Sequence, residues 1–187
     1  MSLRIRKFQS VTDILKPFDC GNADLNGFLI QTSDDSPNAS MYAKELLAET
    51  YVVEDGTTHV ILAYFSILND KIERDLADKQ SWNRLSRRIP NAKRRSSYPG
   101  LKIGRLAVSK DCQGTGLGHK IVNFIQLLFF TNRIAGCRFL TVDALKPAED
   151  FYRKCQFLPL SASSSDNDTV LMFFDLKGIT LPSPVLI

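Results

Sequence analysis

The sequence lacks the cysteine patterns that hold metals or staple small secreted proteins. Its four cysteines are scattered, and none of them forms a Cys-x-x-Cys pair. A zinc site and a secreted disulfide framework are therefore not expected, and we expect no metal at the functional site. From these absences we interpret the chain as a cytoplasmic protein with reduced thiols.

Long apolar runs are also absent. The longest apolar stretch, residues 121–130, is interrupted by Asn123 and Gln126 and is too short to span a bilayer. Residues 1–16 contain no continuous apolar core of the kind that a secretory signal needs. We therefore expect no membrane association.

Acidic residues are missing from one part of the chain. The stretch from Lys79 to Lys102 contains eight basic residues and no acidic one: Lys79, Arg84, Arg87, Arg88, Lys93, Arg94, Arg95 and Lys102. Because the formal net charge of the whole chain is +4, the rest of the chain sums to −4. This excludes a uniformly basic, histone-like protein. One basic surface remains, which either attracts a polyanion by counterion release or is a solvated face without a ligand.

The composition is that of an ordinary globular protein, with 44% hydrophobic and 24% charged residues. The length favours a single domain over residues 1–187. Strand-like and helix-like patterns alternate in the second half, which predicts the α/β class with a mixed sheet and helices on both faces. Residues 71–99 lack a clear period, and we expect them to form a basic insert between strands, with a helix near residues 79–88.

The strongest local signal is a strand, a glycine-rich turn and the start of a helix. The strand over residues 101–108 is followed by Gln113–Gly118, and apolar residues then recur at helical spacing from Ile121. Glycines allow a tight turn and a close approach of an anion. The first N–H groups of a helix have no intrahelical partner. The pattern predicts a phosphate or pyrophosphate site, although the glycines alone would equally fit a turn without a ligand.

Two segments resemble the GCN5-related N-acetyltransferase (GNAT) family. Gln113–Gly118 after the strand at residues 104–108 resembles its acetyl-CoA loop, Gln-x-x-Gly-x-Gly. Residues 148–157 resemble its Ala-x-x-x-Tyr-x-x-x-Gly-Phe segment. Gln156 stands where the family usually has glycine, and Leu145 stands where an asparagine is often found. The resemblance covers residues 100–158 well.

The resemblance implies one GNAT-like domain with a mostly antiparallel sheet, and transfer of an acetyl group from acetyl-CoA to a primary amine by direct attack. The backbone N–H of Val108 would polarise the thioester carbonyl, and Tyr152 would protonate the departing CoA thiolate. The residues implied for cofactor binding are those of the strand end and the loop: Leu106, Ala107, Val108, Gln113, Gly114, Thr115, Gly116, Leu117 and Gly118.

A second resemblance concerns the start of the chain. Residues 18–22 and 25–29, with residues 104–108 and 142–144, resemble the acetyltransferase toxins of toxin–antitoxin pairs. This implies acetylation of aminoacyl-tRNA, inhibition by a small ribbon-helix-helix antitoxin, and a homodimer. The side chains then expected to contact the polyanion are Arg87, Arg88, Arg94 and Arg95.

Three functions remain open at this point. The first is an acetyl-CoA-dependent N-acetyltransferase with an unassigned amine substrate, and the second is its toxin-like form acting on charged tRNA. The third is a nucleic-acid-binding or partner-binding module that has lost catalysis, against which the intact loop and Tyr152 argue. Glu49 is a candidate for a general base, and Asp143 could position an amine or cap the next segment, but neither is singled out by the sequence.

Overall fold

The computed structural model describes residues 2–31, 37–132, 136–160 and 168–179. The strands are β1 (Leu3–Lys7), β2 (Glu49–Asp55), β3 (Ile61–Glu73), β4 (Ser97–Val108), β5 (Phe139–Leu145), β6 (Leu158–Pro159) and β7 (Thr169–Asp175). The α-helices are α1 (Ala23–Ile30), α2 (Ala39–Lys44), α3 (Lys79–Ser86), α4 (Leu117–Thr131) and α5 (Glu149–Lys154). Short 3₁₀ turns cover Asp13–Leu15, Arg74–Leu76, Asn91–Lys93, Lys110–Cys112, Lys146–Ala148 and Leu176–Gly178.

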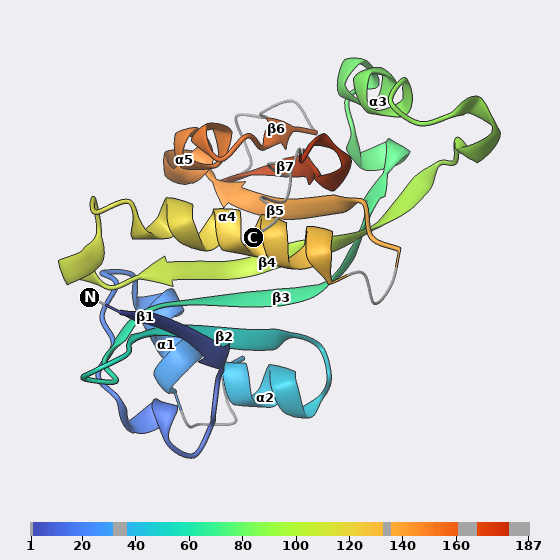
Figure 1. The fold of residues 1–187 in the computed structure, drawn as a ribbon. Coiled ribbons are helices and arrows are strands. Elements are labelled where there is room, and N and C mark those ends of the chain that lie inside the picture. Colours follow the sequence, from blue (N-terminus) through green and yellow to red (C-terminus); the bar gives the residue numbers. More distant parts are fainter. Residues whose placement is uncertain (1, 32–36, 133–135, 161–167, 180–187) are drawn as a thin grey trace, which may run out of the picture. The chain divides into compact units, whose positions relative to one another are not determined.

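The strands follow the hydrogen-bonded order β1-β2-β3-β4-β5-β7-β6 (Figure 1). The β1–β2, β2–β3, β5–β7 and β6–β7 pairs are antiparallel. The neighbours β4 and β5 are joined through α4, the kind of crossover by which a chain returns to place two strands in parallel. The expected mixed, mostly antiparallel sheet of the α/β class is therefore confirmed. None of the helices in the described residues is long and apolar enough to cross a membrane.

The chain forms two compact units. The first comprises Met1–Asn69 and Lys102–Ile121, and the second comprises Asp70–Leu101 and Val122–Ile187. Strands β3 and β4 and helix α4 each contribute residues to both units. The glycine turn and the end of β4 belong to the first unit, whereas α3 and α5 belong to the second.

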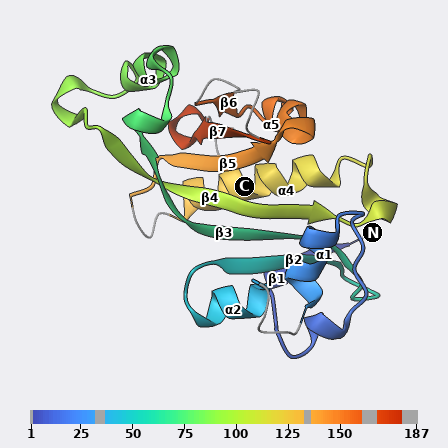
Figure 2. The same ribbon diagram turned by 180° about the vertical axis from the view of Figure 1, so that it is seen from behind.

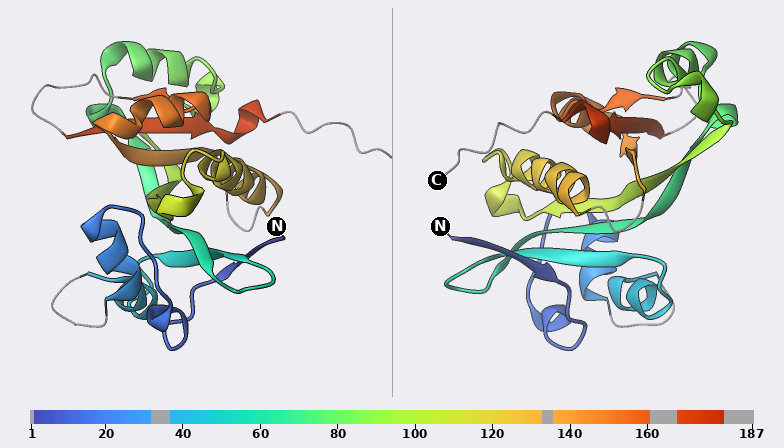
Figure 3. Two further views of the ribbon diagram at one scale, coloured as in Figure 1. Left: turned by 90° about the vertical axis from the view of Figure 1, so that its left-hand side faces the viewer. Right: turned by 45° about the vertical axis from the view of Figure 1, so that its right-hand side comes forward.

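The first unit buries one face of its strands beneath α1 and α2. Phe28 of α1 and Ala39 of α2 pack with Val52 of β2 and Tyr64 of β3 in one apolar cluster. Figures 2 and 3 show both helices beside these strands, on the same side of them. Asn22 caps α1 by accepting a hydrogen bond from the Leu25 N–H, so this helix begins at Ala23.

The second unit has helices on both faces of β5 and β7. Successive strand residues point to opposite faces, so Phe173 and Phe174 face different helices. Phe173 lies in an apolar cluster with Trp82 and Leu85 of α3. Phe174 packs against Phe157, which follows α5, with ring centroids 5.7 Å apart. This confirms helices on both faces for the strands of this unit.

The basic insert is shorter than the sequence predicted. We expected it over residues 71–99, but β3 continues to Glu73 and β4 already begins at Ser97, so the connection covers residues 74–96. Residues 69–73 contain one apolar side chain, Ile72, and therefore show no strand pattern. A hydrogen bond from the Thr141 hydroxyl to Asp70 and the burial of Ile72 stabilise this strand extension. Helix α3 was correctly predicted, and its end at Ser86 lies two residues before the expected end.

The turn after α5 contains a backbone conformation that suits glycine. Gln156 has a φ of 68°, in the left-handed region. Its N–H donates to the Arg153 carbonyl, and the next N–H, that of Phe157, donates to the Tyr152 carbonyl at 3.0 Å. The departure from the family pattern therefore leaves the turn intact, with a strained residue in the glycine position.

We expect Gln156→Gly to raise the free energy of unfolding by about 1 kcal/mol, because glycine removes the steric cost of the left-handed conformation. Thermal or urea denaturation measures the change. Gln156→Ala is the matched control, since alanine retains the Cβ and should give no such gain. Equal stability of the glycine and alanine variants would contradict this account.

Candidate functional site

The turn before α4 has the geometry that an anion-binding loop requires. Gly114 and Gly116 have φ values of 74° and 83°, and a Cβ added at either position would meet nothing within 4 Å. The glycines are therefore needed for backbone conformation and not because of crowding. Within the described residues, the N–H groups of Gly114, Thr115 and Gly116 donate no hydrogen bond. These N–H groups and the open space beside them fit a pyrophosphate.

The first turn of α4 continues this set of donors. Leu117 and Gly118 are the first two helical residues, whose N–H groups have no partner within a helix. Leu117 is buried, so only its backbone N–H could contribute to an anion site. The first turn contains no acidic residue, which keeps the positive end of the helix dipole available.

The side chain of Gln113 holds the turn in place through two hydrogen bonds. Its Nε2 donates to the carbonyl of Val108 at 2.9 Å and to the carbonyl of Cys20 at 2.8 Å. Its own N–H donates to the carbonyl oxygens of Ser109 and Lys110. Gln113 thus connects the end of β4, the turn and the segment before α1, while the free N–H groups begin at Gly114.

The segment before α1 forms a second connection to the turn. The Asp19 carboxylate forms an ion pair with Lys110 at 2.7 Å, and the Asp19 carbonyl accepts from the Lys110 N–H at 2.9 Å. The same carboxylate accepts from the Gly21 N–H and the Asn26 amide. Hydrogen bonds with Lys110, Asn26 and Gly21 lower the pKa of Asp19 to about 2. The sequence indicated this segment only through its resemblance to the toxins. Its contacts with the glycine turn were not predicted.

Tyr152 lies on α5, in the second unit, with 7% of its surface exposed. Its ring packs edge-on against Phe157 at 5.5 Å and against Phe151 at 5.0 Å. Its hydroxyl forms no hydrogen bond among the described residues. The hydroxyl oxygen is not completely buried. Burial raises the pKa of Tyr152, so the phenol keeps its proton at neutral pH.

The four arginines expected to contact a polyanion are all exposed and lie between α3 and β4. Two of them also have structural contacts. Arg94 donates from Nε to the carbonyl oxygens of Ser86 and Ile89 at the end of α3, and Arg88 lies 4.0 Å from the Asp175 carboxylate. Arg84 and Arg87 line a hollow on α3 together with Gln80, Asn83 and Arg88.

The two carboxylates named from the sequence are both on the surface. Glu49 is half exposed and pairs with Lys7 at 3.0 Å. Asp143 is an exposed residue of β5.

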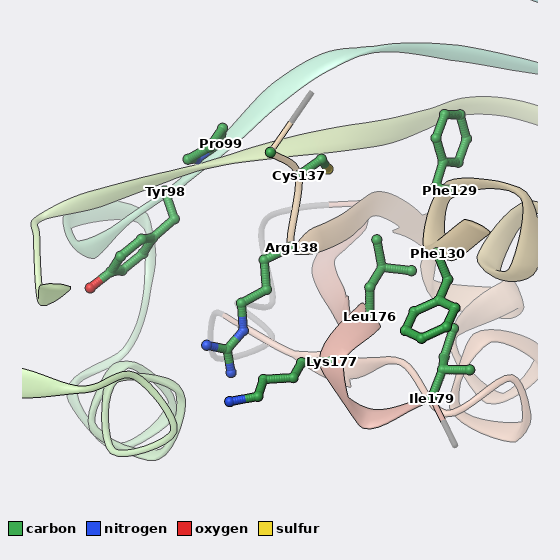
Figure 4. A pocket seen from close by; sticks show the side chains of 10 residues that line it. Tyr98, Pro99, Phe129, Phe130, Cys137, Arg138, Leu176, Lys177 and Ile179 are labelled. Atoms are coloured by element: carbon green, nitrogen blue, oxygen red, sulfur yellow. The ribbon is translucent and has the colours of Figure 1, made fainter. Parts of the chain in front are cut away.

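The second unit also contains an apolar groove of about 860 Å³. Phe129, Phe130, Leu176 and Ile179 line it, and Arg138 extends beside it (Figure 4). The Arg138 guanidinium already forms two hydrogen bonds with the Asp175 carboxylate, at 2.8 and 2.9 Å. None of the residues predicted to bind the cofactor lines this groove, so it is a feature separate from the glycine turn.

The structure thus brings one group of predicted residues together in the first unit: Leu106, Ala107 and Val108 at the end of β4, followed by Gln113–Gly118. Tyr152 and the four arginines belong to the second unit. A strand end, a turn with free N–H groups and a helix N-terminus offer the donors that a phosphate-bearing carrier requires. This set, within the first unit, is typical of the class of acyltransferases that use coenzyme A.

Comparison with protein families agrees with this class. The model of the acetyltransferase (GNAT) domain matches residues 48–158, more than half of the chain. The chain belongs to the GNAT family and is an acetyl-CoA-dependent N-acetyltransferase. No curated protein sequence shows significant similarity to it.

Solved structures similar to this chain include AtaT complexed with acetyl-methionyl-tRNAfMet. That structure has 25% sequence identity and a TM-score of 0.72, with 94% of this chain and 96% of AtaT covered. A tyrosine-to-phenylalanine mutant of KacT has 24% identity and a TM-score of 0.73, with 95% and 96% covered. A tyrosine-to-phenylalanine mutant of the toxin AtaT, bound to the C-terminus of the antitoxin AtaR and acetyl-CoA, has 23% identity and a TM-score of 0.67, with 94% of each chain covered. The two structures with less than 25% identity support the assignment of the fold alone.

We expect Gly116→Ala to lower the affinity for acetyl-CoA about tenfold, because a side chain with a φ near 83° is strained by about 1–2 kcal/mol. Isothermal titration with acetyl-CoA measures the loss. Gly178→Ala is the matched control, since that position has open space around it and no positive φ. Equal affinities for the two variants would rule out a conformational requirement in the turn.

Proposed function

We propose that this enzyme acetylates the amino group of an aminoacyl-tRNA and acts as the toxin of a toxin–antitoxin pair. The observation that carries the proposal is the similarity, over nearly the full length of both chains, to AtaT complexed with acetyl-methionyl-tRNAfMet. An acetylated aminoacyl-tRNA in that complex is the product expected when the acceptor amine is that of a charged tRNA. This acceptor also assigns the enzyme to the cytoplasm.

The basic surface of α3 supports a nucleic-acid acceptor. Arg84 of α3 and Arg87, which directly follows the helix, are exposed and line the same hollow, and α3 itself contains no acidic residue. Positive side chains of this kind bind phosphates by releasing counterions, which gives affinity without reading sequence. An amine acceptor without phosphates would gain nothing from this surface.

In the proposed reaction the enzyme contributes three groups. The N–H groups of residues 114–118 hold the pyrophosphate, and the Val108 N–H polarises the carbonyl that the amine attacks. The Tyr152 hydroxyl donates its proton to the departing thiolate, a role suited to a phenol that burial keeps protonated. Acetyl-CoA, when bound, supplies the acetyl thioester, and the acceptor attacks it directly without a covalent enzyme intermediate.

The proposed partners follow from the same resemblance. The inhibitor is a small ribbon-helix-helix antitoxin, in keeping with the related AtaT bound to the C-terminus of its antitoxin AtaR. We further propose that the chain acts as a homodimer. An acetylation assay that compares small amines, protein N-termini and aminoacyl-tRNA tests the central claim, because activity restricted to small amines or protein N-termini would exclude it. No transfer to any acceptor would favour a binding module.

We expect Tyr152→Phe to lower kcat about 100-fold or more, which is the range lost when a general acid is removed. Affinity for acetyl-CoA should change little, because phenylalanine retains the ring that packs against Phe157. Steady-state kinetics and titration with acetyl-CoA measure the two quantities. An unchanged kcat would remove Tyr152 from the reaction.

We expect the double variant Arg84→Gln/Arg87→Gln to bind tRNA more weakly and with a shallower dependence on salt, since each lost phosphate contact reduces the slope by about one. The matched control is Lys7→Gln/Lys71→Gln, which removes the same charge from two exposed lysines paired with Glu49 and Glu73. Binding measured at several salt concentrations separates the two. Equal slopes would show that net charge, and not the α3 surface, attracts tRNA.

A further inference from the structure

Arg105 is a partly buried cation with unusually few partners. It lies on β4, with 24% of its side chain exposed, and its guanidinium stands 4.0 Å from the ring centroid of Phe28. Its Nε is fully buried and has no hydrogen-bond partner. Among the described residues, the nearest carboxylate is that of Asp24, 3.9 Å away and 79% exposed.

Arg6, in the same unit, shows how a structural arginine is bonded. It forms two hydrogen bonds with Asp13, at 2.6 and 2.7 Å, and a third with Glu54 at 2.7 Å. Both carboxylates are fully buried. Among the described residues Arg105 has no comparable acceptor, and a buried N–H that loses its water without gaining a partner destabilises the fold. Nε itself is closed to solvent, but the side chain is 24% exposed, so the outer end of the guanidinium still requires an acceptor.

The surroundings of Arg105 leave that requirement to a ligand. Tyr64 lies in the same cluster as Phe28, but its hydroxyl donates to the Leu25 carbonyl at 2.7 Å. Phe28 offers only its ring face, which attracts a cation without accepting its in-plane N–H groups. The exposed part of the guanidinium is thus open to an oxygen acceptor from outside the chain.

The position of Arg105 along β4 indicates which substrate brings that acceptor. The residues expected to hold the cofactor are 106–108 and 114–118, and Arg105 precedes all of them along β4. The two side chains nearest its guanidinium, Phe28 and Asp24, lie on α1, which contains none of the residues expected to bind the cofactor. An anion of the acceptor fits this position better than one of acetyl-CoA.

We propose that Arg105 binds a non-bridging oxygen of the phosphodiester next to the aminoacylated nucleotide of the acceptor, and so selects acceptors with a phosphate near the amine. This inference rests on the proposed function. The planar fork of a guanidinium suits a phosphate, to which it can donate two parallel hydrogen bonds. Contact with this single phosphate would position the amine, whereas the exposed arginines of α3 contribute to binding along the nucleic acid.

The test compares two minimal acceptors, an aminoacylated adenosine and the same molecule carrying a 5′-phosphate. We expect the unmodified enzyme to favour the phosphorylated acceptor by about tenfold to a hundredfold in kcat/KM, the range for one charged hydrogen-bonded contact. Arg105→Met should abolish this preference, and Arg105→Lys, which retains the charge without the fork, should retain part of it. The affinity for acetyl-CoA should be unchanged in both variants.

Thermal unfolding separates binding from structure. Arg105→Met should unfold at the same temperature as the unmodified enzyme or higher, because it removes an unpaired buried donor and retains a flexible side chain against Phe28. Arg6→Met is the matched control and should unfold at a lower temperature, since it leaves two buried carboxylates without their partner. A similar loss of stability for Arg105→Met would assign Arg105 to the fold and overturn the inference.

The remaining outcomes show whether the inference or the proposed function fails. If the unmodified enzyme acetylates both acceptors and Arg105→Met keeps the phosphate preference, the inference fails and the proposed function stands. If Arg105→Met weakens acetyl-CoA binding and lowers kcat/KM equally for both acceptors, the anion belongs to the cofactor and the inference is also overturned. If the unmodified enzyme acetylates no aminoacyl ester, either minimal or as tRNA, the proposed function fails and the inference falls with it.

Discussion

The amide of Gln113 donates one hydrogen bond to the Cys20 carbonyl, at 2.8 Å, and another to the Val108 carbonyl, at 2.9 Å. These two bonds fix the glycine turn to the end of β4 and to the segment before α1. A glycine turn that presents free N–H groups has little intrinsic stability, because glycine loses more conformational entropy on ordering than any other residue. The anion site therefore depends on side chains that hold the turn in place before a ligand arrives.

The ion pair between Asp19 and Lys110 supplements this bracing from the same segment. Both side chains are more than half exposed, so the pair alone contributes little to stability. Its effect is local, since the Asp19 carboxylate also accepts hydrogen bonds from Gly21 and Asn26 and thereby orders the approach to α1. The segment that resembles the toxin branch thus helps to hold the glycine turn that we propose for the cofactor, which gives a physical reason for its polar residues.

The sequence predicted those parts of the molecule in which a local requirement dictates the residue type. Gly114 and Gly116 were identified because a phosphate-binding turn needs glycine, and the positive φ values agree with that reason. The contact of Asp19 with Lys110 joins residues 91 positions apart, and no local pattern indicates such a pair. The end of β3 was missed because its last residues are mostly polar, and the start of β4 was missed because Pro99 and Gly100 are residues that usually mark a turn. The unpaired state of Arg105 depends on what surrounds it, which only the folded chain reveals.

The positive charges of this protein perform at least two physically different tasks. The arginines in and after α3 are exposed, so their attraction for phosphates is spread over the surface and screened by salt. Arg105 is largely removed from water and held against Phe28, so fewer side-chain rotamers are lost when it meets an oxygen. Arg6 is somewhat more buried, with 16% of its side chain exposed against 24% for Arg105, but it is saturated by two carboxylates. Net charge therefore says little about function here, because the partners already bonded to each cation decide which of them can recognise a substrate.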